Sequence, residues 1–139
     1  DLARRLGASE ALVQAMLENN ETLACERVEK LDGFQAYGGS KHALVRWMRK
    51  LSPVWAEQGI RINAVAPGTT LTPLLQAGLD DPIWGDAIRG FPVPLGGFAA
   101  PAQIASTLAF FLSDAASFCA GSVLFVDGGT DALLRPDQF

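Results

Sequence analysis

One tyrosine and one lysine are spaced so that they could act together on a proton. Tyr37 and Lys41 stand four residues apart in the segment Tyr-Gly-Gly-Ser-Lys, at the head of a strong helical pattern. On a helix, residues i and i+4 lie on one face, one turn apart. A nearby positive charge favours the ionised form of an acid, so the lysine should make the phenolate easier to form. The pair could then serve as a general acid/base, although the spacing alone favours an incidental pair on a solvated helix face.

The elements that would position this pair are a helix and the strand after it. Residues 36–57 carry apolar side chains at helical spacing, which predicts a helix with a broad apolar stripe. Residues 60–66 predict a strand buried on both faces, as in a parallel sheet. A helix followed by such a strand is typical of an α/β crossover, in which ligands bind at the carboxyl ends of the strands. Pro67-Gly68 ends this strand, so we expect a ligand beside it.

The remaining segments predict shorter elements around this unit. The expected elements are a helix at 9–19, a second helix from Asn20 to a stop at Gly33, a loop-rich stretch with short helical turns at 74–97, a helix at 101–112 that begins with Pro101, and a second buried strand at 123–126. The sequence has no internal repeat and no low-complexity linker, so it predicts a single domain fragment.

The composition excludes several classes of protein. Of the 139 residues, 49% are hydrophobic and 19% charged, and the net charge of -4 gives no basic field for nucleic acid or an anionic membrane. No apolar run is long enough to span a bilayer. Cys25 and Cys119 lack metal-ligand spacing, so we expect two free, buried thiols, no metal site and a cytoplasmic protein. The apolar excess predicts surface that absent strands or another subunit would cover.

The motifs, taken in order, resemble the short-chain dehydrogenase/reductase family. Tyr-x-x-Ser-Lys at 37–41, a helix, a hydrophobic strand and Pro-Gly-x-x-x-Thr at 67–72 follow one another as in that family. The turn Asp-Gly-Gly at 127–129, after the apolar residues 123–126, resembles its last strand and terminal turn. The stretches LTPLLQAGLDDP and DALLRPDQF resemble the bacterial 3-alpha-hydroxysteroid dehydrogenase/carbonyl reductase subgroup. The resemblance runs from about Phe34 to the C-terminus.

The resemblance implies a fold and an activity. The chain would be the C-terminal part of a Rossmann-like α/β domain, a doubly wound parallel sheet with flanking helices. Residues 1–33 would form a helical insertion, and residues 34–139 would hold the catalytic helix, the nicotinamide-side strand, the substrate lid, and the last helix and strand. The activity would be oxidation of an alcohol or reduction of a ketone with NAD or NADP, on a hydrophobic, steroid-like substrate, by a homodimer or homotetramer.

The resemblance also assigns roles at the Tyr-Lys turn and at the strand end. Tyr37 would be the general acid/base on the substrate oxygen, and Lys41 would bind the hydroxyls of the nicotinamide ribose. Pro67 and Gly68 would shape the wall beside the nicotinamide. The backbone near Thr70 and the hydroxyl of Thr72 would contact the cofactor's carboxamide and pyrophosphate. Ordinary turn chemistry is the alternative for both threonines.

The loop after Thr72 would be the substrate lid. Its apolar side chains suit a large hydrophobic alcohol or ketone, and the candidate substrate contacts are Leu74, Trp84 and Phe91. The alternative for the two aromatic residues is that they only pack the loop down.

The sequence also departs from the family pattern. It has no G-x-G-x-x-G motif for a pyrophosphate, and Ala24 occupies the position thirteen residues before the tyrosine where the family has its catalytic serine. We expect this chain to be part of a larger enzyme, with the serine before Asp1, and to bind no dinucleotide by itself. Two alternatives remain: a catalytically inactive fragment that serves as an oligomerisation or binding module, and an unrelated α/β binding domain.

Overall fold

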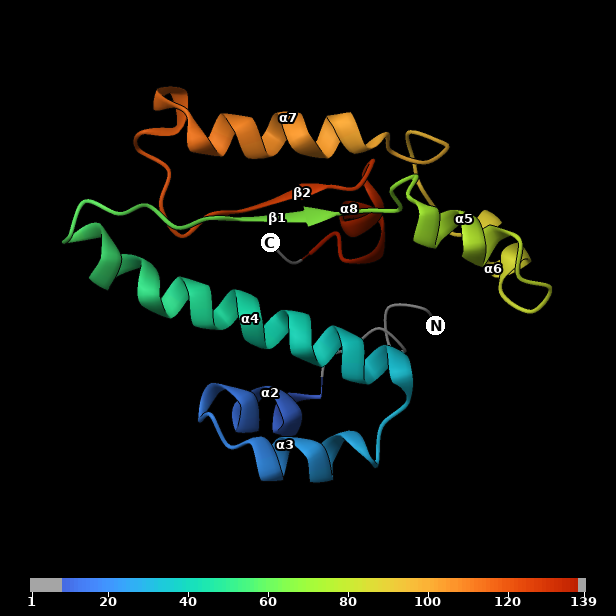
Figure 1. The fold of residues 1–139 in the computed structure, drawn as a ribbon, viewed down its shortest axis with the longest axis horizontal. Coiled ribbons are helices and arrows are strands. Elements are labelled where there is room, and N and C mark those ends of the chain that lie inside the picture. Colours follow the sequence, from blue (N-terminus) through green and yellow to red (C-terminus); the bar gives the residue numbers. More distant parts are fainter. Residues whose placement is uncertain (1–8, 138–139) are drawn as a thin grey trace. The chain divides into compact units, whose positions relative to one another are not determined.

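The computed structural model describes residues 9–137 (Figure 1). The chain divides into two compact units, and each is described by itself. The first unit runs as far as Ala64 and includes residues 120–122. The second unit holds residues 65–119 and the chain from Val123 onward.

Three helices make up most of the first unit. Helix α2 (Glu10–Leu17) and helix α3 (Glu21–Val28) form an antiparallel hairpin beside the long helix α4 (Gly33–Ala56) (Figure 1). The side chain of Asn20 accepts a hydrogen bond from the backbone N–H of Leu23, so the predicted cap of the second helix is confirmed. The hairpin has its own small apolar core, made of Leu12, Ala15 and Ala24 with Met16, Leu23 and Leu31 packed against it.

Helix α4 begins earlier than the sequence predicted. Asp32 is its N-cap and accepts a hydrogen bond from the N–H of Gln35 at 2.8 Å. Gly33 therefore starts α4, and its prediction as the stop of the preceding helix is wrong. At the other end Pro53 lies in the last turn, and Gly59, with φ +74°, takes the chain out of the helix as predicted.

Two short strands pair side by side in a parallel sheet. Strand β1 (Ala64–Pro67) and strand β2 (Val123–Val126) are neighbours. The N–H of Ala64 donates to the carbonyl of Ser122, and the N–H of Gly68 donates to the carbonyl of Val126. Both partners advance by four residues in the same direction, which defines a parallel pair. The predicted α/β class is confirmed.

The first strand is shorter and more exposed than predicted. The N–H of Ile60 bonds to the carbonyl of Trp55 at 2.9 Å, so residue 60 still belongs to the turn that ends α4 and the strand begins only at Ala64. Strand β1 is partly buried, and in β2 the side chains of Leu124 and Phe125 are 41% and 42% exposed. The expectation of two fully buried strands is therefore wrong for the part of the chain that the structure describes.

The rest of the second unit is more helical than predicted. It contains α5 (Pro73–Leu79), α6 (Gly85–Arg89), α7 (Pro101–Leu112), a 3-10 turn (Asp114–Ala116) and α8 (Thr130–Leu134). Pro101 begins α7 as predicted, whereas α8 was not anticipated.

Neither cysteine forms a disulfide. Cys25 is exposed, because it faces away from the hairpin core that its neighbour Ala24 joins, and Cys119 is half-buried, so the prediction of buried thiols is wrong. Over residues 9–137, no helix has the length and apolar character that crossing a membrane requires.

Candidate active site

Tyr37 and Lys41 lie together in the second and third turns of α4. The ammonium nitrogen Nζ of Lys41 lies over the ring of Tyr37, 5.4 Å from its centroid, so the predicted shared face is confirmed. Tyr37 is 66% exposed, which leaves the phenol accessible to a bound molecule. Ser40, between them in the motif, turns its hydroxyl to the backbone and donates to the carbonyl of Tyr37 at 2.8 Å. This arrangement can present a proton donor with a cation beside it.

The end of β1 is built on a close contact with the turn after β2. A Cβ added to Gly68 would lie 2.6 Å from the Cα of Asp127, so only glycine fits this position. The Asp127 carboxylate accepts hydrogen bonds from the backbone N–H groups of Gly129 and Asp131, at 2.9 and 2.7 Å. Asp127 thus fixes the turn that supports Gly68. The sequence marked 127–129 as a turn but did not assign Asp127 this function.

Both candidate threonines make hydrogen bonds within the protein. The hydroxyl of Thr70 donates to the carbonyl of Gly68 at 2.9 Å, and the hydroxyl of Thr72 accepts from the N–H of Leu75 at 3.2 Å, which caps α5. Ordinary turn chemistry therefore accounts for one bond of each. A hydroxyl offers one proton and two lone pairs, so the proton of Thr72 and the lone pairs of Thr70 are not used in these bonds.

Thr69 is a residue that the sequence reasoning missed. Its Oγ1 is buried without a hydrogen-bond partner among the described residues. It lines a cavity of about 510 Å³ together with the turn after β2 and the segment before α7. Buried hydroxyls are normally hydrogen-bonded, so this atom is suited to a polar group or an ordered water that enters the cavity. The motif Pro-Gly-Thr-Thr contained the hydroxyl, but nothing in the sequence indicated its burial.

The three candidate substrate residues follow the strand end. Leu74, in the first turn of α5, is 84% exposed, and Trp84, just before α6, is 50% exposed. Phe91, just after α6, is partly buried. Helices α5 and α6 pack closely, since a Cβ on Gly78 would lie 2.7 Å from the side chain of Ile88. The segment is therefore a compact helical pair that presents apolar side chains outward.

The candidate residues fall into two groups by unit. Tyr37 and Lys41 belong to the first unit, and the candidates from Pro67 to Phe91 belong to the second. The structure brings Tyr37 and Lys41 together in the first unit, and in the second it joins Thr70 to Gly68 through a hydrogen bond. Within residues 9–137, no group of three histidine, cysteine or acidic side chains is placed to hold a metal ion.

Comparison with known proteins places the chain in a family. Residues 9–131 match the family model described as enoyl-(acyl carrier protein) reductase. The 3-alpha-hydroxysteroid dehydrogenase/carbonyl reductase of Comamonas testosteroni is 48% identical over 114 residues, which cover 82% of this chain and 44% of that protein. The chain belongs to the short-chain dehydrogenase/reductase family.

Solved structures agree with this assignment. The 3-alpha-hydroxysteroid dehydrogenase from Pseudomonas sp. B-0831, complexed with NADH, superposes with a TM-score of 0.87 at 45% identity, covering 99% of this chain and 55% of that one. A structure from Agrobacterium tumefaciens with bound NADP gives a TM-score of 0.63 at 34% identity, over 70% of this chain and 39% of that one. These neighbours are Rossmann-fold dehydrogenases, and the chain spans about half the length of the relatives that it matches.

Proposed function

We propose that this chain supplies the catalytic part of an NAD(P)-dependent oxidoreductase that acts on a hydroxyl or keto group of a hydrophobic, steroid-like substrate. The observation that carries the proposal is the Lys41 ammonium over the exposed ring of Tyr37, in a member of this family. In this proposal residues 1–139 are the C-terminal portion of one short-chain dehydrogenase domain. Residues 1–33 form its helical insertion.

Tyr37 and Lys41 each have a chemical role in the proposal. Tyr37 gives its proton to the substrate oxygen when a ketone is reduced and takes it back when an alcohol is oxidised. A positioned O–H donor stabilises the negative charge that develops on that oxygen. Lys41 binds the ribose hydroxyls of the cofactor. A nicotinamide supplies the hydride chemistry when it is bound.

The residues at the end of β1 carry hydrogen-bond donors and acceptors that suit a nicotinamide. A carboxamide needs one acceptor and one donor, and the hydroxyls of Thr69 and Thr70 retain unused capacity for both. The unused proton of Thr72 suits a pyrophosphate oxygen. Pro67 and Gly68 form the wall beside the ring. The two solved neighbours contain NADH and NADP respectively, so the proposal leaves the choice between the two cofactors open.

The lid, the assembly and the location complete the proposal. Leu74, Trp84 and Phe91 contact the apolar part of the substrate, which is supported by the exposure of the first two. The names of the Comamonas and Pseudomonas relatives support a steroid alcohol or ketone as the substrate. The enzyme is cytoplasmic, in line with two cysteines that form no disulfide, and it is a homodimer or homotetramer.

An association module is the second candidate function. Helix α7 buries none of its residues, and Leu108 and Leu112 are 48% and 85% exposed. In β2 the side chains of Leu124 and Phe125 are exposed as well. A helix and a strand this apolar favour a partner surface, with or without catalysis.

The catalytic proposal is tested in a chimera. The chain is joined behind the N-terminal, nucleotide-binding part of the Comamonas testosteroni relative, and NADH-dependent ketone reduction is followed with and without Tyr37→Phe. We expect the parent chimera to turn over a steroid ketone, and we expect Tyr37→Phe to lower kcat by 10²-fold or more, as for loss of a general acid. The Kd for NADH should be nearly unchanged. Retained turnover in Tyr37→Phe would disprove the role of this tyrosine.

Turnover of the chimera separates the two candidate functions, and the 139-residue chain alone tests whether the N-terminal part is needed for cofactor binding. This chain lacks a glycine-rich pyrophosphate motif, so we expect no NADH fluorescence change on titration. An active chimera supports the catalytic proposal, whereas a folded chimera that binds NADH but has no turnover supports the association module.

A further inference from the structure

The turn that carries Tyr37 and Lys41 rests on a neighbouring helix at a single glycine. Gly39 lies between the two candidate catalytic residues in the motif and is buried. A Cβ built on it would lie 2.8 Å from Cδ2 and 3.5 Å from Cγ of Leu12 in α2. Real Cβ atoms essentially never approach another carbon at 2.8 Å, so α2 occupies the space of the absent side chain.

Gly39 is on the opposite side of α4 from the catalytic pair. Each residue turns the helix by 100°, so position 39 points about 200° away from both position 37 and position 41. Leu12 therefore packs against this turn of α4 on the face opposite to Tyr37 and Lys41. Any shift of α2 at this point would move the backbone that sets the direction of both side chains.

Leu12 is itself held firmly. It is 0% exposed and belongs to the core of the α2–α3 hairpin, with Ala15 and Ala24. Two residues earlier, Glu10 accepts a hydrogen bond from Arg46 of α4 at 2.6 Å. The hairpin is thus joined to α4 by an apolar contact at Gly39 and by an ion pair about two turns further along.

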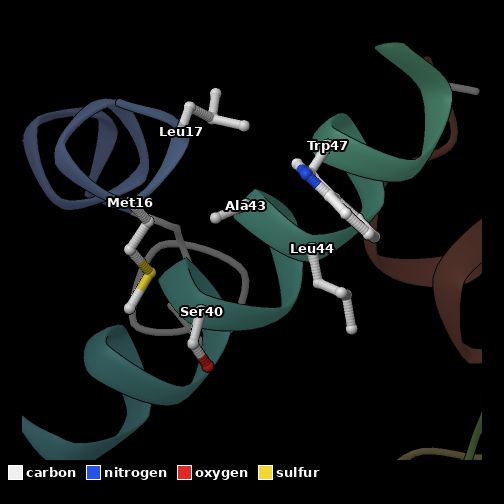
Figure 2. Close-up of a pocket in the computed structure, with 6 residues that line it drawn as sticks. All are labelled: Met16, Leu17, Ser40, Ala43, Leu44 and Trp47. Carbon is white, nitrogen blue, oxygen red and sulfur yellow. The ribbon is translucent and has the colours of Figure 1, made fainter. Parts of the chain in front are cut away.

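The contact between α2 and α4 is not equally tight along its length. Figure 2 shows Met16 and Leu17 of α2 on one side of a small hollow, with Ser40, Ala43, Leu44 and Trp47 of α4 on the other. The hollow has a volume of about 220 Å³. The close fit at Gly39 is therefore a point of direct contact between the two helices, and it lies beside this hollow.

We propose that the α2–α3 hairpin is a positioning element for the active site, acting through Leu12 and Gly39 on the turn that orients Tyr37 and Lys41. Its effect on turnover rests on the proposed function, but its effect on the Tyr-Lys contact does not. The competing explanation is that Gly39 only lets two helices pack, in which case its substitution changes stability and leaves the front of the turn unaltered.

A size-swap series distinguishes these explanations. Gly39→Ala adds the methyl group that collides with Leu12, and Leu12→Val removes the δ-methyl groups that it meets. The double variant should restore the fit. Gly33→Ala is the matched control, since it makes the same change in α4 at a position with no atom within 4 Å of the added Cβ.

The first readout is NMR of the 139-residue chain. Tyr37 is the only tyrosine, so its ring signals and their nuclear Overhauser effects to the Lys41 methylenes report on the contact directly. We expect Gly39→Ala to reduce the ring-current shifts of the Lys41 methylenes by half or more. Gly33→Ala should leave them unchanged, and Gly39→Ala/Leu12→Val should return them. Unchanged Lys41 signals in a folded Gly39→Ala variant, or no return in the double variant, would overturn the proposal.

The second readout is turnover in the chimera. A displacement of about 1 Å in a catalytic group can cost 10²-fold in rate, so we expect Gly39→Ala to lower kcat at least tenfold with little change in KM, and the double variant to recover it. A change in thermal stability without a change in kcat would contradict a positioning role. If the Lys41 signals respond as expected while the parent chimera has no turnover, the positioning inference stands and the proposed function fails.

Discussion

At Thr72, a role in capping α5 can be separated from a role in binding the cofactor. Its hydroxyl accepts the N–H of Leu75 and so caps α5, while its own proton is left for a pyrophosphate oxygen. Thr72→Val removes both functions and should destabilise the start of α5 by about 1 kcal/mol. Thr72→Asp keeps a capping acceptor, but it has no proton to donate and adds a negative charge.

The two substitutions therefore predict different results in two assays. Hydrogen exchange at the Leu75 amide should be faster in Thr72→Val and close to the parent in Thr72→Asp. NADH binding by the chimera should be weaker in both, and weakest in Thr72→Asp because like charges repel. If Thr72→Asp binds NADH as tightly as the parent, the pyrophosphate role is wrong and only the cap remains.

At this scale the sequence predicted what depends on local spacing. Four residues on a helix place Tyr37 and Lys41 on one face, and the structure shows the contact. The sequence did not predict the buried hydroxyl of Thr69. Its burial depends on the segments around residues 95 and 127, which lie beside the end of β1. Nor did the sequence predict that Gly39 receives Leu12, since contacts between helices depend on the crossing and not on the motif.

Among the elements, α2 and α4 are joined by a pH-dependent ion pair. The hydrogen bond from Arg46 lowers the pKa of Glu10 from 4.5, helped by the charges of Arg46 and His42 and opposed by desolvation. A carboxyl group whose pKa is lower in the folded state stabilises the fold at pH values above its pKa in the unfolded state. That contribution is lost as the pH falls through its pKa in the folded state. Because Glu10 is largely exposed, the effect should be small and sensitive to salt.

We therefore expect Glu10→Gln to unfold at lower urea concentration than the parent at neutral pH. The difference should disappear when the pH is brought below the lowered pKa of Glu10, where the parent carboxyl is also uncharged. Glu26→Gln, at an exposed position of α3, is the control and should show no such pH-dependent difference. An equal difference at both pH values would show that the substitution acts through packing and not through charge.

Element boundaries were predicted less well than element types. The long helix, the parallel α/β pair and Pro101 at the start of α7 followed from periodicity and from residue types with strong local preferences. The start of α4 was placed about three residues late because Asp32-Gly33 fits a helix stop as well as a start. Strand β1 was predicted too long because apolar runs do not reveal which backbone groups the preceding turn has already used.

For the whole molecule, the apolar composition corresponds to exposed apolar side chains on both units, and in the second unit they include those of α7. Leu112 in α7 is 85% exposed, and Phe118, shortly after it, is fully exposed. Exposed apolar side chains that gather on one element are typical of a surface that a partner covers, whereas scattered ones carry no such meaning. Such a surface would recruit a partner whether the chain is catalytic or an association module, so association can be tested without any cofactor.

A pair of equally exposed leucines provides the test. Leu112 lies in α7, and Leu95, which is 87% exposed, lies in the segment before it. We expect the 139-residue chain to associate with increasing concentration in sedimentation velocity, and Leu112→Glu to shift it toward the monomer, since a buried unpaired carboxylate opposes association. Leu95→Glu makes the same change in charge and should leave the association nearly intact. An equal shift in both variants would mean that net charge controls association, and a parent chain that stays monomeric at every concentration would show that α7 recruits no second copy.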